Sequence, residues 1–152
     1  GLGYDADMME GFFDEAVTRL DSLIAGTLSL PDLCSAFADF HTSNALVFAA
    51  RVICSCHMQL NADDFLPFIA DARPSVKDFV THEVEPLDKE VEHVQIMALS
   101  QAFAVPLRIL YLDRSPGPLN HHDFSEGPSD ADAGHVVHML YRPGHYDLLY
   151  TA

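Results

Sequence analysis

Apolar residues recur over the first two thirds of the chain at intervals of three and four positions, the spacing of amphipathic helices. Residues that favour helix starts and stops divide this pattern into separate stretches. The six predicted helices cover residues 7–24, 29–40, 42 or 43–57, 61–69, 75–84 and 91–103. Their starts are marked by Asp5 or Asp7, Ser29, Thr42 or Ser43, Asn61 and Ser75. Residues 45–53 are nearly all apolar, so we expect the third helix to be buried.

After Pro106 the pattern changes to short apolar runs separated by turn-forming residues, which is typical of strands. The predicted strands cover residues 107–112, 120–124, 135–141 and 146–150, and a polar, acidic loop spans residues 125–134. Helices followed by strands indicate an α+β domain with an antiparallel sheet. The 152 residues suit a single domain with a real hydrophobic core.

The last two strands are joined by Arg142-Pro143-Gly144-His145, which predicts a tight type II turn. Side chains alternate between the two faces of a strand, so His145, Asp147 and Leu149 share one face. A carboxylate two positions from a histidine can hold the imidazole and fix its tautomer, as the third member of a catalytic triad does. The alternative is a hydrogen-bonded surface pair without a role in chemistry, which is the commoner arrangement at a turn.

The net charge of −15 is large for this length. It argues against nucleic acid or an anionic membrane surface as a partner and favours a basic protein surface. No apolar run reaches the ~20 residues that cross a bilayer. The odd number of cysteines, without the layout of a disulfide framework, favours a reducing compartment, the cytoplasm or the nucleus.

A cluster of histidines near the C-terminus raises the question of a metal site; it consists of His121, His122, Asp123, His135 and His138. Neighbours in a strand point to opposite faces, as do residues three apart, so these side chains do not converge. We therefore expect no metal site, and nothing in the sequence calls for an organic cofactor.

The three cysteines are weak candidates for a nucleophile. A reactive thiolate usually lies at a helix N-terminus or beside a cation. Cys34 lies beyond the first turn of its predicted helix, and Cys54 and Cys56 lie near the end of theirs, where the helix dipole disfavours a thiolate. Cys54 and Cys56 are also about 200° apart on a helix, so they do not share a metal ion, and burial is the commoner explanation.

The string RPGHYDLLY, residues 142–150, resembles the strand that carries the catalytic histidine in otubains, the ubiquitin-specific cysteine peptidases of the ovarian-tumour (OTU) family. Other stretches resemble otubains in the same order: Phe68-Ile69, SVKDF (75–79), EVEP (83–86), EVEHVQIMAL (90–99), LRILYLDR (107–114) and NHHDF (120–124). The resemblance runs nearly end to end and is weaker before about Leu60.

This resemblance implies a papain-like OTU fold and cleavage of the isopeptide bonds of ubiquitin conjugates by a cysteine nucleophile. It further implies ubiquitin and polyubiquitin as partners, with a family preference for the chains that direct proteins to the proteasome, and no cofactor. His145 matches the general base of the family and Asp147 the group that orients it. Some otubains hold ubiquitin-conjugating enzymes without cleaving anything, which makes these enzymes possible partners as well.

The chain also departs from the family pattern, because the Asp-Gly-Asn-Cys-Phe segment with the nucleophile is absent from the 152 residues. It therefore resembles a single but partial otubain-like domain over residues 1–152, the C-terminal two thirds, without a nucleophile and inactive alone. Two alternatives stay open: a non-catalytic module that binds ubiquitin or a ubiquitin-conjugating enzyme, and an incomplete gene model or truncated product. An in-frame Asp-Gly-Asn-Cys segment upstream of Gly1 would favour the peptidase.

Overall fold

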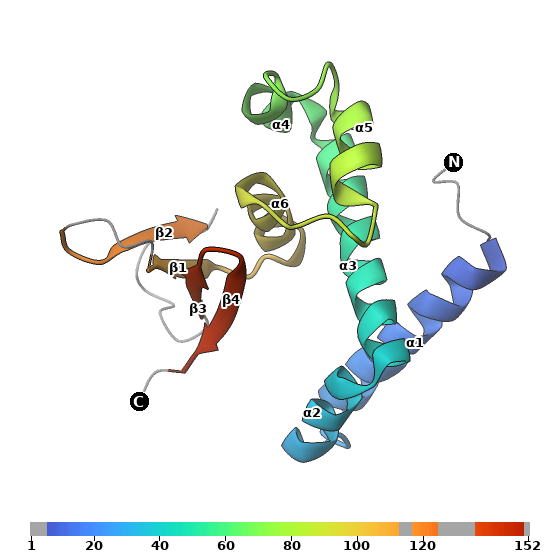
Figure 1. Ribbon diagram of the computed structural model, residues 1–152. Helices are drawn as coiled ribbons and strands as arrows, with labels where there is room; N and C mark the ends of the chain where they lie inside the picture. The colour runs from blue at the N-terminus through green and yellow to red at the C-terminus, as the bar shows by residue number, and fades with distance from the viewer. Residues whose placement is uncertain (1–5, 113–116, 125–135, 151–152) are drawn as a thin grey trace. The chain divides into compact units, whose positions relative to one another are not determined.

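The computed structural model describes residues 6–112, 117–124 and 136–150. The predicted cap at Asp5, the loop 125–134 and His135 lie outside these residues. The order of elements is the predicted one, with helices first and strands after them (Figure 1). Contacts between Cα atoms divide the chain into two compact units, Gly1–Val91 and Glu92–Ala152.

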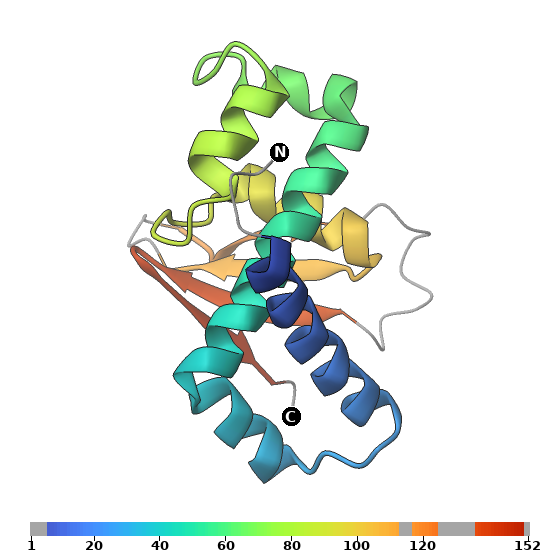
Figure 2. The same cartoon turned by 90° about the vertical axis from the view of Figure 1, so that its right-hand side faces the viewer.

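The first unit is built around the long helix α3. Its elements are α1 (Ala6–Ile24), α2 (Leu30–Ala38), α3 (Phe40–Leu60), α4 (Ala62–Ile69), α5 (Val76–Phe79) and the π-helix η1 (Val80–Val84). Helix α3 contacts each of the others, and Figure 2 shows α1 lying beside it. The predicted burial of this helix is confirmed, since its buried apolar residues include Ala45, Phe48, Ala49 and Val52.

Side-chain caps explain where three of these helices begin, whereas the predicted cap Asn61 precedes α4 without a side-chain hydrogen bond to it. The Oγ atoms of Ser29 and Ser75 accept hydrogen bonds from backbone N–H groups of the first helical turn, as predicted. The predicted start of the third helix at Thr42 or Ser43 is wrong. Asp39 is the cap, because its carboxylate accepts the N–H of Thr42 at 2.8 Å and the helix begins one residue after it.

The predicted helix over residues 75–84 consists of two parts. Helix α5 continues directly into η1, where the N–H of Glu85 donates to the carbonyl of Val80 at 2.9 Å, five residues back. Within the same unit the guanidinium of Arg51 donates to the carbonyl of Val84 at 2.8 Å. A buried cation therefore satisfies a carbonyl group at the end of η1, where the helix leaves it without a helical partner.

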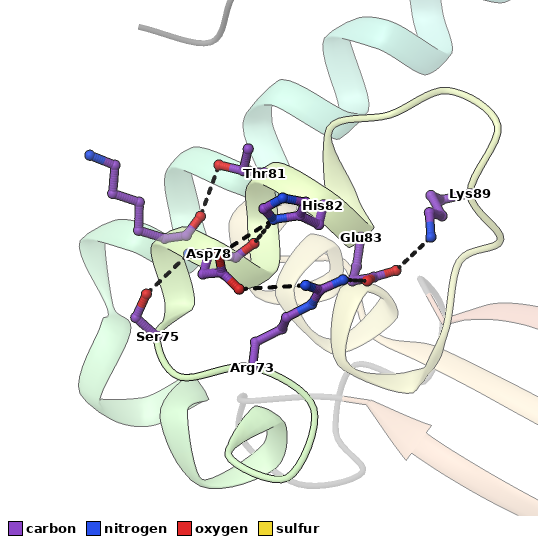
Figure 3. A network of polar contacts seen from close by, with 8 residues as sticks. Arg73, Ser75, Asp78, Thr81, His82, Glu83 and Lys89 are labelled. Atoms are coloured by element: carbon purple, nitrogen blue, oxygen red, sulfur yellow. Dashed lines mark hydrogen bonds and ion pairs between the residues drawn. The ribbon is translucent and has the colours of Figure 1, made fainter.

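A network of charged side chains connects η1 with the chain on both sides of the α5–η1 helix (Figure 3). The carboxylate of Glu83 forms an ion pair with Arg73 and a second one with Lys89, whose Nζ lies 3.1 Å from Oε2 of Glu83. Arg73 also lies 3.7 Å from the carboxylate of Asp78. These pairs lower the pKa of the Glu83 carboxyl, mainly through the hydrogen bond from Arg73. The network ties three separate segments of the first unit together.

Within the described residues, no single helix is long and apolar enough to cross a membrane. Helices α3 and α4 pass that test only as a pair, by length and composition, and they are bent by 101° where they meet.

The second unit packs one helix against one face of a sheet. Its elements are α6 (His93–Phe103), β1 (Leu107–Tyr111), β2 (Asn120–Phe124), β3 (Val137–Arg142) and β4 (His145–Leu149). The last helix begins at His93, two residues after its predicted start, because the side chains of Glu92 and Gln95 form a capping box there. Ile96 of α6 joins Ile109 and Phe124 of the sheet in the buried core of the unit.

The predicted antiparallel sheet is wrong in one pairing, because the sheet is mixed. Its strand order is β2-β1-β3-β4, and β1 pairs in parallel with β3, whereas the other two pairings are antiparallel. Residues 125–136 separate β2 from β3 in the sequence. Strand β3 pairs with the edge of β1 that β2 leaves open, and not with the free edge of β2.

Candidate functional site

The candidate site lies on the β3–β4 hairpin, which turns over two residues. Arg142 and His145 form the last pair of the ladder, so only Pro143 and Gly144 lie in the loop. Gly144 has φ +78°, the value that the third position of a type II turn requires, and this agrees with the predicted turn. The turn thus places Arg142 directly across from His145 on the same face of the sheet.

His145 and Asp147 are in contact on that face, as predicted from the alternation of side chains. The Nε2 atom of His145 lies 3.0 Å from Oδ1 of Asp147. Arg142 approaches the other carboxylate oxygen, donating from Nη2 to Oδ2 at 3.1 Å. One carboxylate therefore holds an imidazole with one oxygen and a guanidinium with the other.

These three side chains are about half exposed, so water reaches the site. The hydrogen bond from His145 is the main cause that lowers the pKa of the Asp147 carboxyl, and the charge of Arg142 acts in the same direction. Asp147 is consequently ionised at neutral pH. An ionised carboxylate only accepts hydrogen bonds, so a neutral His145 ring carries its proton on Nε2 and presents the lone pair of Nδ1. This is the form in which an imidazole acts as a base.

The opposite face of the hairpin is anchored by a row of aromatic rings that contact one another at a tilt. The ring centroids of Tyr146 and Tyr141 are 4.9 Å apart, and those of Tyr141 and Tyr111 are 5.1 Å apart. Tyr146 stands between His145 and Asp147 in β4. Its packing against the core of the second unit therefore holds the strand that carries both polar residues.

Of the three cysteines, the buried one has a thiol that resists ionisation. Cys54 is buried, and desolvation raises the pKa of its thiol to about 12. Cys34 and Cys56 are exposed, so the interpretation of Cys56 as a buried cysteine is wrong, since it lies on the solvent side of α3. All three belong to helices of the first unit.

The histidines of β2 point to opposite faces, as predicted. His122 packs its ring against Tyr111, with centroids 5.0 Å apart, whereas His121 lies 3.8 Å from the carboxylate of Asp123 on the other face. That carboxylate accepts two hydrogen bonds from Arg108. Among the described residues, no group of three or more His, Cys, Asp or Glu side chains could hold a metal ion.

Comparison with known proteins identifies the family of the chain. The sequence profile described as Peptidase C65 Otubain matches residues 1–151. The chain belongs to the otubain family. The ubiquitin thioesterase OTUB2 of Homo sapiens is 36% identical over 150 residues, covering 99% of this chain and 61% of that protein. The ubiquitin thioesterase OTUB1 of Homo sapiens is 38% identical over 149 residues, covering 97% of this chain and 52% of that protein.

Solved structures confirm the predicted fold class. The otubain chain superposes on the structure of a ceOTUB1 ubiquitin aldehyde UBC13~Ub complex with a TM-score of 0.84 and 28% identity, covering 98% of this chain and 60% of that one. The OTU domain of OTUD1 matches with a TM-score of 0.56 at 18% identity, a likeness in fold alone. The chain thus has the α+β OTU fold and spans about half to three fifths of the length of its otubain relatives.

Arg142 is predicted from the sequence only as part of the turn, yet it belongs to the site. The signal was present, because a loop of two residues places the flanking residues directly opposite each other. Arg142 is therefore diagonal to Asp147 on the same face, within reach of a long side chain.

Proposed function

We propose that this chain supplies the general base and its orienting carboxylate to an otubain-type cysteine deubiquitinase. The observation that carries the proposal is the 3.0 Å contact between His145 and Asp147, on the residues that match the family motif. Membership of the otubains supports the reaction class. The 152 residues would form part of one otubain-like domain that continues in a longer protein.

The proposed reaction is cleavage of the isopeptide bond between the C-terminus of ubiquitin and a lysine side chain, with polyubiquitin that directs proteins to the proteasome as the preferred substrate. His145 would take the proton of a cysteine thiol, and the resulting thiolate would attack the isopeptide carbonyl. The imidazolium would then give its proton to the departing lysine amine, which leaves a thioester for water to hydrolyse. Nε2 of His145 is hydrogen-bonded to Asp147, so Nδ1 would accept the thiol proton and later donate it to the amine.

The experiment that tests this proposal uses the natural protein that carries the chain and measures cleavage of diubiquitin. His145→Ala should abolish turnover, because the thiol then has no base. His138→Ala is the matched control, since it removes a histidine from the neighbouring strand β3 and should leave turnover unchanged. Full turnover by His145→Ala would refute the proposed role of this hairpin.

A second prediction is that the 152-residue chain alone cleaves no diubiquitin. It contains no Asp-Gly-Asn-Cys segment, and burial keeps the thiol of Cys54 protonated. Treatment with ubiquitin carrying a C-terminal electrophile should give no covalent adduct in a mass spectrum. An adduct on Cys34, Cys54 or Cys56 that disappears in His145→Ala would show that the chain contains its own nucleophile.

The proposed partners are ubiquitin and polyubiquitin. The solved relatives were captured with ubiquitin aldehyde and with UBC13~Ub or UBCH5B~Ub, which supports ubiquitin-conjugating enzymes as further partners. The net charge of −15 favours a basic face on any such protein. The cysteine pattern supports the cytoplasm or the nucleus as the location.

The alternative function is a non-catalytic module that binds ubiquitin or a ubiquitin-conjugating enzyme. It is favoured by the ubiquitin-charged conjugating enzymes present in the structures of the solved relatives. Titration of the 152-residue chain with ubiquitin-charged UBC13 in a calorimeter separates the two functions. Binding by a chain whose natural protein cleaves no diubiquitin would favour the module.

A further inference from the structure

We propose that Arg142 is a positioning residue that holds Asp147 in the orientation needed to orient His145. The inference rests on the proposed function, because it assigns a task within the same base. It derives from two contacts of the Asp147 carboxylate. Oδ1 is hydrogen-bonded to the ring of His145, and Oδ2 accepts a hydrogen bond from Arg142.

The hairpin fixes the direction from which Arg142 approaches. Arg142 is the last residue of β3 and pairs with His145, so only the two residues of the turn separate them in the sequence. A carboxylate bound through one oxygen can still rotate about its Cβ–Cγ bond and lose its partner. A second hydrogen bond from a fixed direction on the other oxygen opposes that rotation, as outer partners do for other polar side chains in functional sites.

A comparison within the same sheet face shows that this sharing is specific to the hairpin. Arg108 binds Asp123 through two N–H groups, at 2.7 Å and 2.8 Å, and so takes both carboxylate oxygens. The neighbouring His121 stays 3.8 Å from Asp123. Arg142 instead donates one N–H at 3.1 Å and leaves Oδ1 to the imidazole. The two pairs have the same chemical components, but only the hairpin pair holds a histidine at hydrogen-bond distance.

The usual role of an exposed ion pair does not account for this arrangement. Pairs of half-exposed side chains joined by a single hydrogen bond contribute little to stability. A stabilising role would therefore predict almost no measurable effect of removing Arg142. A positioning role predicts an effect on the ring of His145, and this difference makes the inference testable.

The first test measures the tautomer of His145 from two-bond ¹H–¹⁵N correlations in the natural protein, at a pH where the ring is neutral. The wild type should hold the proton on Nε2. Arg142→Gln should move the tautomer ratio at least halfway toward the ratio measured in Asp147→Ala. Arg108→Gln is the matched control, because it removes the other arginine of an ion pair on this face, two strands away, and should leave the ratio unchanged.

The second test measures turnover of a fluorogenic ubiquitin substrate by the same variants. Arg142→Gln should lower kcat about tenfold with KM unchanged, as the loss of an outer hydrogen-bond partner does elsewhere. Arg142→Lys should keep kcat within about twofold of the wild type, because the structure uses a single N–H and an ammonium supplies one. The melting temperature of Arg142→Gln should match that of the wild type.

The outcomes separate this inference from the proposed function. A wild-type protein that hydrolyses no ubiquitin substrate would refute the proposed function, and the tautomer ratio would then decide the role of Arg142 by itself. Wild-type tautomer ratios in Arg142→Gln would overturn the positioning role. The same holds if Arg142→Lys loses as much kcat as Arg142→Gln.

Discussion

At the scale of single residues, the contact between His145 and Asp147 has two components, a hydrogen bond and a negative charge. Asp147→Asn keeps the size of the side chain but removes the charge and allows the amide to present its NH₂ to the ring. In the natural protein we expect kcat to fall by roughly 10²- to 10⁴-fold with substrate binding intact, as for other orienting residues. Steady-state kinetics separate the two parameters. Full activity would mean that another residue orients the imidazole, with β3 as the place to search.

Two carboxylates on this sheet face also predict how the protein responds to acid. Hydrogen bonds from His145 and from Arg108 lower the pKa values of Asp147 and Asp123, respectively, below their ordinary value of 3.8. A lowered folded-state pKa gives stability that is complete above the unfolded value and lost as pH falls through the folded value. Melting temperatures should therefore fall as the pH drops through 3.8 and below it, and less steeply in Asp123→Asn. An equal dependence of melting temperature on pH in the wild type and in Asp123→Asn would refute the contribution of the Arg108–Asp123 ion pair.

The sequence predicts the residues of the site to the extent that they follow from local geometry. The alternation of side chains in β4 is enough to place His145 beside Asp147, and it is confirmed. Arg142 requires the pairing register across the turn, which a single strand does not contain. The exposure of Cys56 depends on which side of α3 is covered by other helices, and this is a property of packing that its neighbours in sequence do not reveal.

At the scale of elements, the hairpin turn depends on one residue that adopts a positive φ. Gly144 has φ +78°, and a Cβ atom there would meet nothing within 4 Å, so the cost of a side chain is conformational and not steric crowding. We expect Gly144→Ala to lower the free energy of unfolding by about 1–2 kcal/mol. Chemical denaturation measures this difference.

Gly11 provides the matched control, because it lies inside α1 and a Cβ atom there also meets nothing within 4 Å. Gly11→Ala should raise the free energy of unfolding by about 0.5–1 kcal/mol, since alanine restricts the unfolded chain and favours the helix. The same chemical change thus has opposite signs at the two positions. Stabilisation by Gly144→Ala would show that the turn relaxes to another conformation.

The helices and strands were predictable because their signals are local, whereas the sheet pairing was not. Caps such as Ser29 and Ser75 act within one helical turn, and the strand bounds agree to within one or two residues. The parallel pairing of β1 with β3 depends on where the chain returns after residues 125–136. Apolar alternation is the same for either pairing, so the strand sequence alone does not decide between them.

At the scale of the whole molecule, each of the two units has buried apolar side chains of its own. Fully buried large side chains of the first unit include Phe48, Phe65 and Met58. The buried cluster of the second unit consists of Ile96, Ile109 and Phe124, with partly buried neighbours. Domains of about 60 residues are marginal even with a complete core.

The predicted single domain therefore leads to a thermodynamic test, in which both units unfold in one transition. Tyrosine fluorescence reports on the second unit, which contains all the tyrosines except Tyr4, and helical circular dichroism reports mainly on the first. Phe48→Ala and Ile109→Ala each remove a fully buried side chain, at a cost of about 2–5 kcal/mol. In one cooperative domain, each variant should shift both signals to the same lower midpoint, because unfolding either unit unfolds the other. A shift confined to fluorescence in Ile109→Ala, and to circular dichroism in Phe48→Ala, would instead show two independent domains. In that case the hairpin with His145 and Asp147 could be studied on the second unit alone.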